Sequence, residues 1–348
     1  MGLGTWDIAS IGVLAISLGL MGSGYFYRKR NRHIFLAGGE LLFGLFWLTF
    51  IPVYLEKGDN INLVFCFAAL PFFTLLAYHE YLCYKRDEEL QPLNWIAGTS
   101  FFAALIYFSV EYIPFIHYML VYIVAFKSAA VASLFGFATE TKILTSWWRF
   151  TEHSVLMVHQ GRGNIRIILA CTGIQAIALF IGMIITTKPD RSLWIDWAKE
   201  NHKLVKKKLQ NASGFKKFRL RLVKRTLENL FYRSDRHRVA LALMYTVPII
   251  YLTNLLRNAA LVYVVYEKKL EVMASKIPFV VDDFDLAHNW LTKFMSLALM
   301  LFMLLLLFDI LPELQENVLG LMDVFRYRKK DNVRDGFVEL DFDLDTDT

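Results

Sequence analysis

The feature that most constrains this chain is a series of apolar blocks, each about 20 residues long. A helix of that length crosses the hydrocarbon core of a bilayer, where every backbone N–H and C=O group must be paired within the protein. Hydrophobic residues make up 56% of the chain, above the ~45–50% of a typical soluble domain. We place the candidate spans at residues 7–27, 34–55, 61–84, 94–113, 116–137, 165–187, 239–263 and 291–312. The sequence therefore predicts an all-α polytopic membrane bundle, with about seven or eight transmembrane helices.

The segment 188–238 orients the later spans. It contains sixteen Lys and Arg residues against five Asp and Glu residues, and such basic connections stay in the cytoplasm. The net charge of +6 is thus explained by basic loops on the cytoplasmic side, and we expect no nucleic-acid partner. We divide the chain into N-terminal transmembrane helices (1–137), an outer loop with a Cys-bearing helix (138–187), the basic cytoplasmic insertion (188–238), Arg- and His-bearing helices (239–312) and a cytoplasmic tail (313–348).

The N-terminal half leaves two topologies open. The basic run at residues 28–33 is typical of a cytoplasmic loop and would place the N-terminus outside. Eight spans with a cytoplasmic tail require the N-terminus inside. Either segment 116–137, with Lys127 at its centre, is re-entrant, or the first loop violates the positive-inside bias.

Three reactive side chains fall in one outer layer under this orientation. Cys171 lies near the outer start of its span, and His288 lies just before the last span. Arg257 follows the basic insertion by 19 residues, or roughly 28 Å of helical rise, which also brings it to the outer face. A thiol, a guanidinium and an imidazole are suited to act as nucleophile, charge stabiliser and base.

Each of these residues also has a purely structural interpretation. Cysteine is among the most buried residue types, and we interpret Cys66 and Cys83 as structural. An arginine near a helix end can reach the interface, and an interfacial histidine can be without a role. Against this, Asn254, Arg257 and Asn258 share one helical face, which would not be turned towards lipid.

Short motifs around these residues resemble the exosortase/archaeosortase family. They are Cys171-Thr-Gly-Ile-Gln-Ala, then Ile250-Tyr-Leu followed by Asn254-Leu-Leu-Arg-Asn258, and Ala287-His-Asn289, and the second form is most similar to the archaeosortase A branch. The resemblance covers roughly residues 140–312. The basic insertion is longer than the family pattern, which leaves the subfamily and its sorting motif open.

The resemblance implies a membrane cysteine transpeptidase with its active site on the extracytoplasmic side of a plasma membrane, in an archaeal cell. Such an enzyme cleaves C-terminal sorting signals of surface proteins and transfers the new C-terminus to a membrane lipid. Cys171, Arg257 and His288 would be catalytic. The expected substrate-binding or supporting residues are Thr172, Gly173, Gln175, Tyr251, Asn254, Asn258 and Asn289.

We expect no metal or other cofactor, because the chain contains no CxxC pair, no HExxH motif and no Gly-rich phosphate loop. The competing function is that of a multi-pass transporter or receptor, in which Arg257 and His288 bind a ligand or protons. That function favours further polar residues deep in the spans, where Glu40 and Lys127 are the exceptions to an apolar pattern. The sequence does not indicate an oligomeric state.

Overall fold

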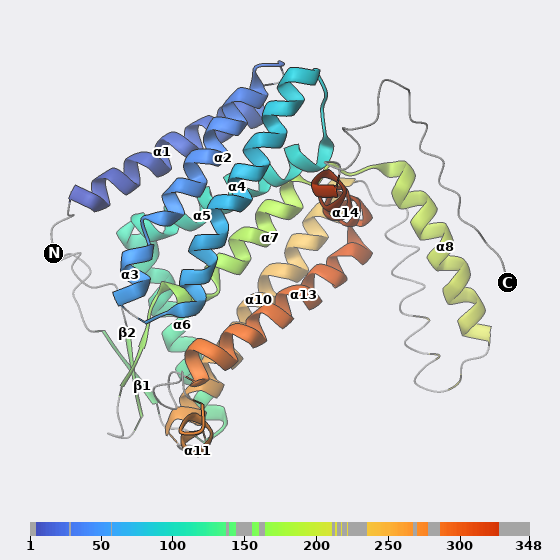
Figure 1. Cartoon of the computed structure of the whole chain (residues 1–348). Coiled ribbons are helices and arrows are strands. Elements are labelled where there is room, and N and C mark those ends of the chain that lie inside the picture. The colour runs from blue at the N-terminus through green and yellow to red at the C-terminus, as the bar shows by residue number, and fades with distance from the viewer. Residues whose placement is uncertain are drawn as a thin grey trace.

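The computed structural model describes residues 5–27, 29–56, 58–136, 139–143, 155–159, 164–210, 213, 217, 221, 235–266, 270–277 and 286–326. Within these ranges the chain is an all-α helical bundle, as predicted, with one small sheet added to it (Figure 1). Most of segment 211–234 and the acidic end of the tail lie outside the described residues.

The helices, in chain order, are α1 (Thr5–Phe26), α2 (Arg32–Leu48), α3 (Ile51–Glu56), α4 (Asn60–Arg86), α5 (Gln91–Tyr112), α6 (Pro114–Leu134), α7 (Ile174–Thr186), α8 (Arg191–Gln210), α10 (Asp235–Tyr266), α11 (Glu271–Ala274), α13 (Thr292–Ile310) and α14 (Pro312–Arg326). The 3-10 helix η2 (Leu169–Thr172) precedes α7, and the π-helix η3 (Leu286–Leu291) continues into α13. The strands are β1 (Thr139–Ile143), β2 (Val155–His159) and β3 (Asn164–Ile167).

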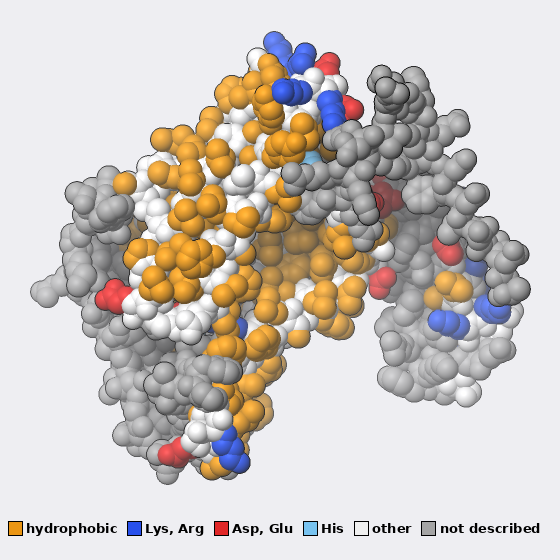
Figure 2. Space-filling view, in the orientation of Figure 1, with side chains coloured by type: hydrophobic (Ala, Val, Ile, Leu, Met, Phe, Trp, Pro, Cys, Tyr) orange, Lys and Arg blue, Asp and Glu red, His pale blue; other side chains and the backbone are white. Residues whose placement is uncertain are grey.

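The described residues contain seven helices that are long and apolar enough to cross a membrane. They are Ala9–Phe26, Arg32–Glu56, Asn60–Arg86, Gln91–Tyr112, Pro114–Leu134, His237–Val264 and Leu286–Ile310, and α7 is a shorter apolar helix. Apolar side chains cover the flank of the bundle (Figure 2), and Phe294, Leu301 and Phe302 on α13 are more than half exposed. Soluble proteins rarely expose so large an apolar surface. The protein is therefore a multi-pass membrane protein.

Helices α5 and α7 lie side by side because small residues let their backbones approach. A Cβ atom added to Gly182 of α7 would lie 2.7 Å from the carbonyl oxygen of Thr99 on α5. The hydroxyls of Thr99 and Thr186 are hydrogen-bonded at 3.0 Å, and the Trp95 indole donates to the Met183 carbonyl at 3.3 Å. Side-chain hydrogen bonds of this kind help to join helices where no water is present.

Charged contacts gather at one end of the bundle, which we call the basic end (Figure 2). The contacts there are the ion pairs Arg30–Asp87, Arg32–Glu89 and Arg238–Glu313, and a hydrogen bond from Lys188 to Gln91. Glu313 belongs to α14, so the segment expected as a tail begins with a helix that packs against α5, α8 and α13. The Arg238 guanidinium is fully buried and makes two hydrogen bonds to Glu313, of 3.2 and 2.8 Å.

The opposite end carries α6, the sheet, η2 and η3 (Figure 1), and we call it the site end. The strands form an antiparallel sheet in the order β1-β2-β3, with Thr139 opposite His159 and Val155 opposite Ile167. From the sequence we expect only an outer loop here, and a span over 165–187. Instead β3 and η2 occupy the first part of that segment, and the helix begins at Ile174. Cys171 thus precedes the helix that it was expected to be part of.

Candidate active site

The turn that carries Cys171 is fixed by its own backbone and by Thr172. Ile168 has an extended backbone, and the Cys171 N–H donates to its carbonyl at 2.9 Å. The Thr172 hydroxyl donates to the Leu169 carbonyl at 2.6 Å and accepts the Ile174 N–H at 3.3 Å. Thr172 is buried, so its described role is to cap this turn and the start of α7.

Gly173 allows the turn to pass directly into α7. Its φ of 76° lies in the left-handed region, where a side chain costs roughly 1–2 kcal/mol. A Cβ atom here would also lie 3.2 Å from Cγ of Asn254. Gly173 is one of the expected substrate-binding or supporting residues, and the side chain closest to it is that of Asn254 on α10.

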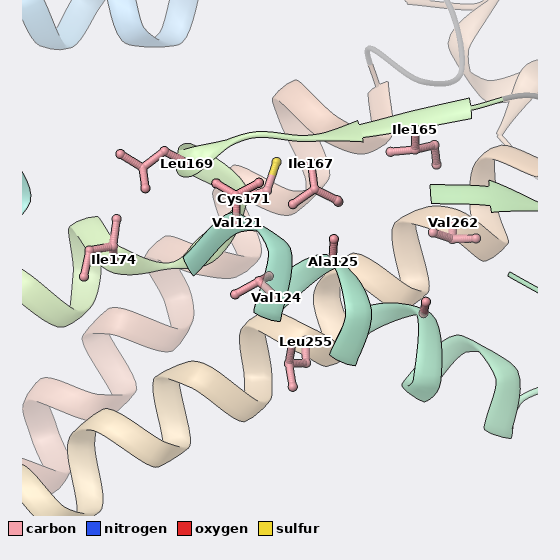
Figure 3. Packing of buried hydrophobic residues seen from close by; sticks show 11 residues of the cluster. Val121, Val124, Ala125, Ile165, Ile167, Leu169, Cys171, Ile174, Leu255 and Val262 are labelled. Atoms are coloured by element: carbon pink, nitrogen blue, oxygen red, sulfur yellow. The ribbon is translucent and has the colours of Figure 1, made fainter. Parts of the chain in front are cut away.

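The Cys171 thiol lies in an apolar cluster between η2, α6 and α10 (Figure 3). Only 4% of the residue is exposed, and Val121, Ile167 and Leu255 belong to the same cluster. Burial raises the pKa of the Cys171 thiol, while a backbone hydrogen bond at Ile168 and the positive charge of Arg257 lower it. The thiol at rest is therefore neutral at neutral pH, and a base is needed to make it a nucleophile.

Two asparagines of α10 hold the backbone of Cys171. The Nδ2 atoms of Asn254 and Asn258 donate to the Cys171 carbonyl at 2.7 and 3.0 Å. Both residues are buried, and Asn258 also donates to the Ser128 hydroxyl of α6 at 3.3 Å. The polar face of α10 therefore faces protein, as its i, i+3, i+4 spacing indicated, and it fixes the position of the Cys-bearing turn.

Arg257 completes this face. Its Nη1 atom donates to the Ser296 hydroxyl of α13 at 3.1 Å, and its Nη2 atom donates to Oδ1 of Asn258 at 3.4 Å. The charge of Arg257 acts on the Cys171 thiol. Tyr251, six residues earlier on α10, packs against the apolar cluster around Cys171. The structure thus brings Cys171 and Arg257 together, and Ser296 links them to α13.

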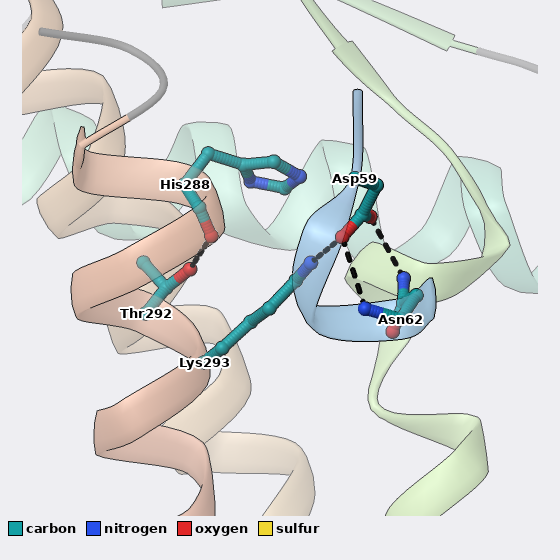
Figure 4. Close-up of polar contacts among 5 residues, drawn as sticks. All are labelled: Asp59, Asn62, His288, Thr292 and Lys293. Atoms are coloured by element: carbon teal, nitrogen blue, oxygen red, sulfur yellow. Dashed lines mark hydrogen bonds and ion pairs between the residues drawn. The ribbon is translucent and has the colours of Figure 1, made fainter. Parts of the chain in front are cut away.

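His288 lies in η3, on the same continuous helix as Ser296 and at the same end of the bundle. His288 precedes Ser296 by eight positions, or about 12 Å of helical rise, so it lies beyond Arg257 towards the site end. Its carbonyl accepts the Thr292 hydroxyl, and its imidazole points towards the turn that contains Asp59 (Figure 4). Lys293 of α13 makes an ion pair with Asp59 at 2.7 Å.

Gln175 is exposed, and its Nε2 atom lies 3.5 Å from the hydroxyl of Tyr107 on α5. Tyr107 in turn interacts with Glu111, one turn further along α5. Gln175 thus connects the start of α7 to a tyrosine and a carboxyl group that the sequence did not single out. The side chain of Asn289 lies outside the described residues.

The other two thiols lie in different parts of the bundle. Cys66 and Cys83 are both buried on α4, and Cys83 lines a cavity of about 410 Å³ near the basic end, beside His79 and Arg86. Among the described residues, no cluster of His, Cys, Asp and Glu has the arrangement that a metal ion requires.

The sequence does not single out Ser128, Ser296 or Asp59. Each lies on another element than its partner, Asn258, Arg257 or Lys293, and is far from it in the sequence. No spacing between neighbouring residues predicts these contacts. The Asx pattern of Asp59 followed by Asn62 could have identified a helix cap, but not its neighbour Lys293.

Comparisons of this chain with protein-family models, with curated proteins and with solved structures find no match. The family resemblance and the roles that it implies therefore remain predictions, and the geometry of the site is their present support.

Proposed function

We propose that this protein is a membrane-embedded cysteine transpeptidase. It would cleave C-terminal sorting signals of surface proteins and transfer the new C-terminus to a membrane lipid. The observation that carries the proposal is the joint arrangement of Cys171 and Arg257. Asn254 and Asn258 flank Arg257 on α10 and both hold the Cys171 carbonyl, so the thiol and the guanidinium are fixed relative to each other.

The reaction would start with proton transfer from the buried thiol of Cys171 to His288. The thiolate sulfur then attacks the scissile carbonyl carbon, and a C–S bond forms as the carbonyl oxygen becomes an oxyanion. Arg257 supplies positive charge and N–H donors to that oxyanion. His288 returns the proton to the leaving amine when the C–N bond breaks. An amine or hydroxyl of a lipid, or water, then attacks the thioester and releases the sulfur.

The proposed sidedness follows from charge. The basic end carries Arg30, Arg32, Lys188 and Arg238, whereas Cys171 and Arg257 lie towards the site end. Basic segments stay in the cytoplasm. We therefore propose that the site faces outward across the plasma membrane, in an archaeal cell.

A trapped acyl-enzyme tests the proposal. Purified protein is incubated with a peptide that has a helical apolar tail and a basic end, and the thioester is identified by mass spectrometry. We expect an adduct on Cys171 that is absent in Cys171→Ala and unchanged in Cys66→Ala and Cys83→Ala. An adduct that persists in Cys171→Ala would refute the nucleophile assignment.

One observation favours the competing class, a transporter. Among the described residues, neither carboxylate oxygen of the fully buried Glu40 has a hydrogen-bond partner, and Glu80 contacts the His33 imidazole at 2.5 Å. Buried ionisable groups of this kind occur on proton pathways. Proton flux into reconstituted vesicles that is lost in Glu40→Gln, together with no adduct on Cys171, would favour transport.

A further inference from the structure

The turn before α4 holds a carboxylate in a fixed position beside His288. Asp59 caps α4, since its Oδ1 atom accepts the Asn62 N–H at 3.2 Å and its Oδ2 atom accepts the Asn62 side-chain amide at 2.8 Å. The Oδ1 atom also accepts Nζ of Lys293 at 2.7 Å. Asp59 and Lys293 are only 17% and 24% exposed. Three donors from two helices therefore hold this carboxylate in place.

The described contacts leave Asp59 with room for one more donor. A carboxylate offers about four lone-pair positions, and the contacts with Asn62 and Lys293 use three of them. Figure 4 shows the imidazole of His288 directed towards this carboxylate from the neighbouring helix. His288 lies in the π-helical turn η3, and π-turns are frequent at functional sites.

We propose that Asp59 is the positioning residue for His288, a role that rests on the proposed function. A carboxylate that accepts one ring N–H fixes the tautomer and the direction of the other ring nitrogen. Lys293 and Asn62 hold Asp59, Asp59 orients the imidazole, and His288 exchanges a proton with the Cys171 thiol during the reaction. No atom of Asp59 contacts the substrate in this arrangement.

The charges around His288 have opposite signs, and this makes the proposal testable. Asp59 stabilises an imidazolium, whereas Lys293 destabilises it. Arg257 on α10 also destabilises it, since α10 packs against η3. Glu111 on α5 is a further carboxyl towards this end, and both Glu111 and Asp59 interact electrostatically with Tyr54. Removing Asp59 and removing Lys293 should therefore change the protonation of His288 in opposite directions.

The experiment measures the modification of His288 by diethylpyrocarbonate as a function of pH, with mass-spectrometric mapping of the modified peptide. The full-length protein is used in detergent. We expect Asp59→Asn, which keeps the cap of α4, to move the pH midpoint of modification down by about one unit. Lys293→Gln should move it up by a similar amount, and Asp59→Glu, which retains the charge, should stay within half of the Asp59→Asn shift.

Activity supplies the second measurement. We expect Asp59→Asn to lower kcat by about ten- to a hundredfold with little change in KM, since a positioning residue acts through a general base that contributes 10²–10⁴-fold. Asn62→Ala removes one of the donors that hold Asp59, the side-chain amide, so it should move the midpoint in the same direction as Asp59→Asn and by less. Asp87→Asn, at the basic end, is the matched control and should leave the modification midpoint unchanged. Midpoints that move in the same direction in Asp59→Asn and Lys293→Gln, or that do not move, would overturn the proposal. The modification assay does not require turnover, so a wild-type protein that forms no acyl-enzyme would refute the proposed function alone.

Discussion

Removing the two donors to the Cys171 carbonyl should have a strongly non-additive effect. A carbonyl oxygen has two lone pairs, and Asn254 and Asn258 use one each, at 2.7 and 3.0 Å. Either single Ala variant leaves the oxygen with one donor, and a net hydrogen bond contributes about 1 kcal/mol. The double variant leaves a buried carbonyl without these donors, which adds about 1–3 kcal/mol to the two single losses. We therefore expect a coupling energy of about 1–3 kcal/mol between the two sites.

Alkylation of Cys171 by a maleimide, followed by mass spectrometry, measures this coupling in the native protein. The thiol is 4% exposed, so it reacts only when η2 opens away from α10. Since 1.36 kcal/mol corresponds to a factor of ten, we expect each single variant to react about fivefold faster and the double variant at least about a hundredfold faster. Thr253→Ala is the control, because within the described part of the chain the Thr253 hydroxyl bonds to carbonyls of its own helix. If the rate increases of the two single variants simply multiply in the double variant, Asn254 and Asn258 do not stabilise the position of Cys171 jointly.

Three further variants test the surroundings of the thiol. Gly173→Ala should lower the thermal midpoint in detergent more than Gly58→Ala, because both residues have positive φ but only Gly173 is close to Asn254. Burial raises the pKa of Cys171 and Arg257 lowers it, so Arg257→Met should slow alkylation at fixed pH and move its midpoint to higher pH. Because the folded-state pKa is raised, the stabilisation from the neutral thiol is present below the ordinary thiol pKa and is lost as pH rises through the folded value. Arg257→Lys should lower turnover about as much as Arg257→Ala, by roughly 10²–10³-fold, because lysine lacks the planar fork; near-normal turnover would contradict the oxyanion role.

Hydropathy predicted the helices of the bundle because lipid imposes length and apolar composition on every span. It failed at 165–187, where Ile165, Ile167, Ile168 and Leu169 extend the apolar run and Gly173 is the break between η2 and α7. An apolar strand that is buried against α6 cannot be distinguished from a membrane helix by composition. Hydropathy also missed the distinction between α13, which exposes its flank, and α7, which is largely buried.

Helical spacing predicted the part of the site that comes from a single helix. Asn254, Arg257 and Asn258 lie on one face in any α-helix, so their common direction could be read from the sequence. The sequence could not show that two of these side chains would bond to the backbone carbonyl of Cys171, since that depends on how closely α10 approaches η2. The same holds for Asp59, whose partner Lys293 follows it by more than half the chain.

The order of contacts along the chain also bears on the two topologies of the N-terminal half. Helix α5 begins at the basic end, where Lys188 contacts Gln91, and it ends at Tyr112, one residue before α6. Helix α6 then contacts η2 and β1, and Ser128 of α6 bonds to Asn258 at the site end. The end of α5, which precedes α6, and the sheet that follows α6 thus both lie at the site end. This favours an α6 that begins and ends on the same side of the membrane.

If α6 does not cross, the crossing helices are α1, α2 with α3, α4, α5, α7, α10 and α13, and the N-terminal side of α1 faces outward with Cys171. The two ends of α6 provide the test, through the variants Ile113→Cys and Gly136→Cys with a membrane-impermeant maleimide on intact cells. Both positions are exposed. We expect both variants to be labelled and a Lys188→Cys control at the basic end to remain unlabelled. Labelling of only one of the two would show that α6 spans the membrane. A crossing α7 would then place the basic insertion outside, against the positive-inside expectation.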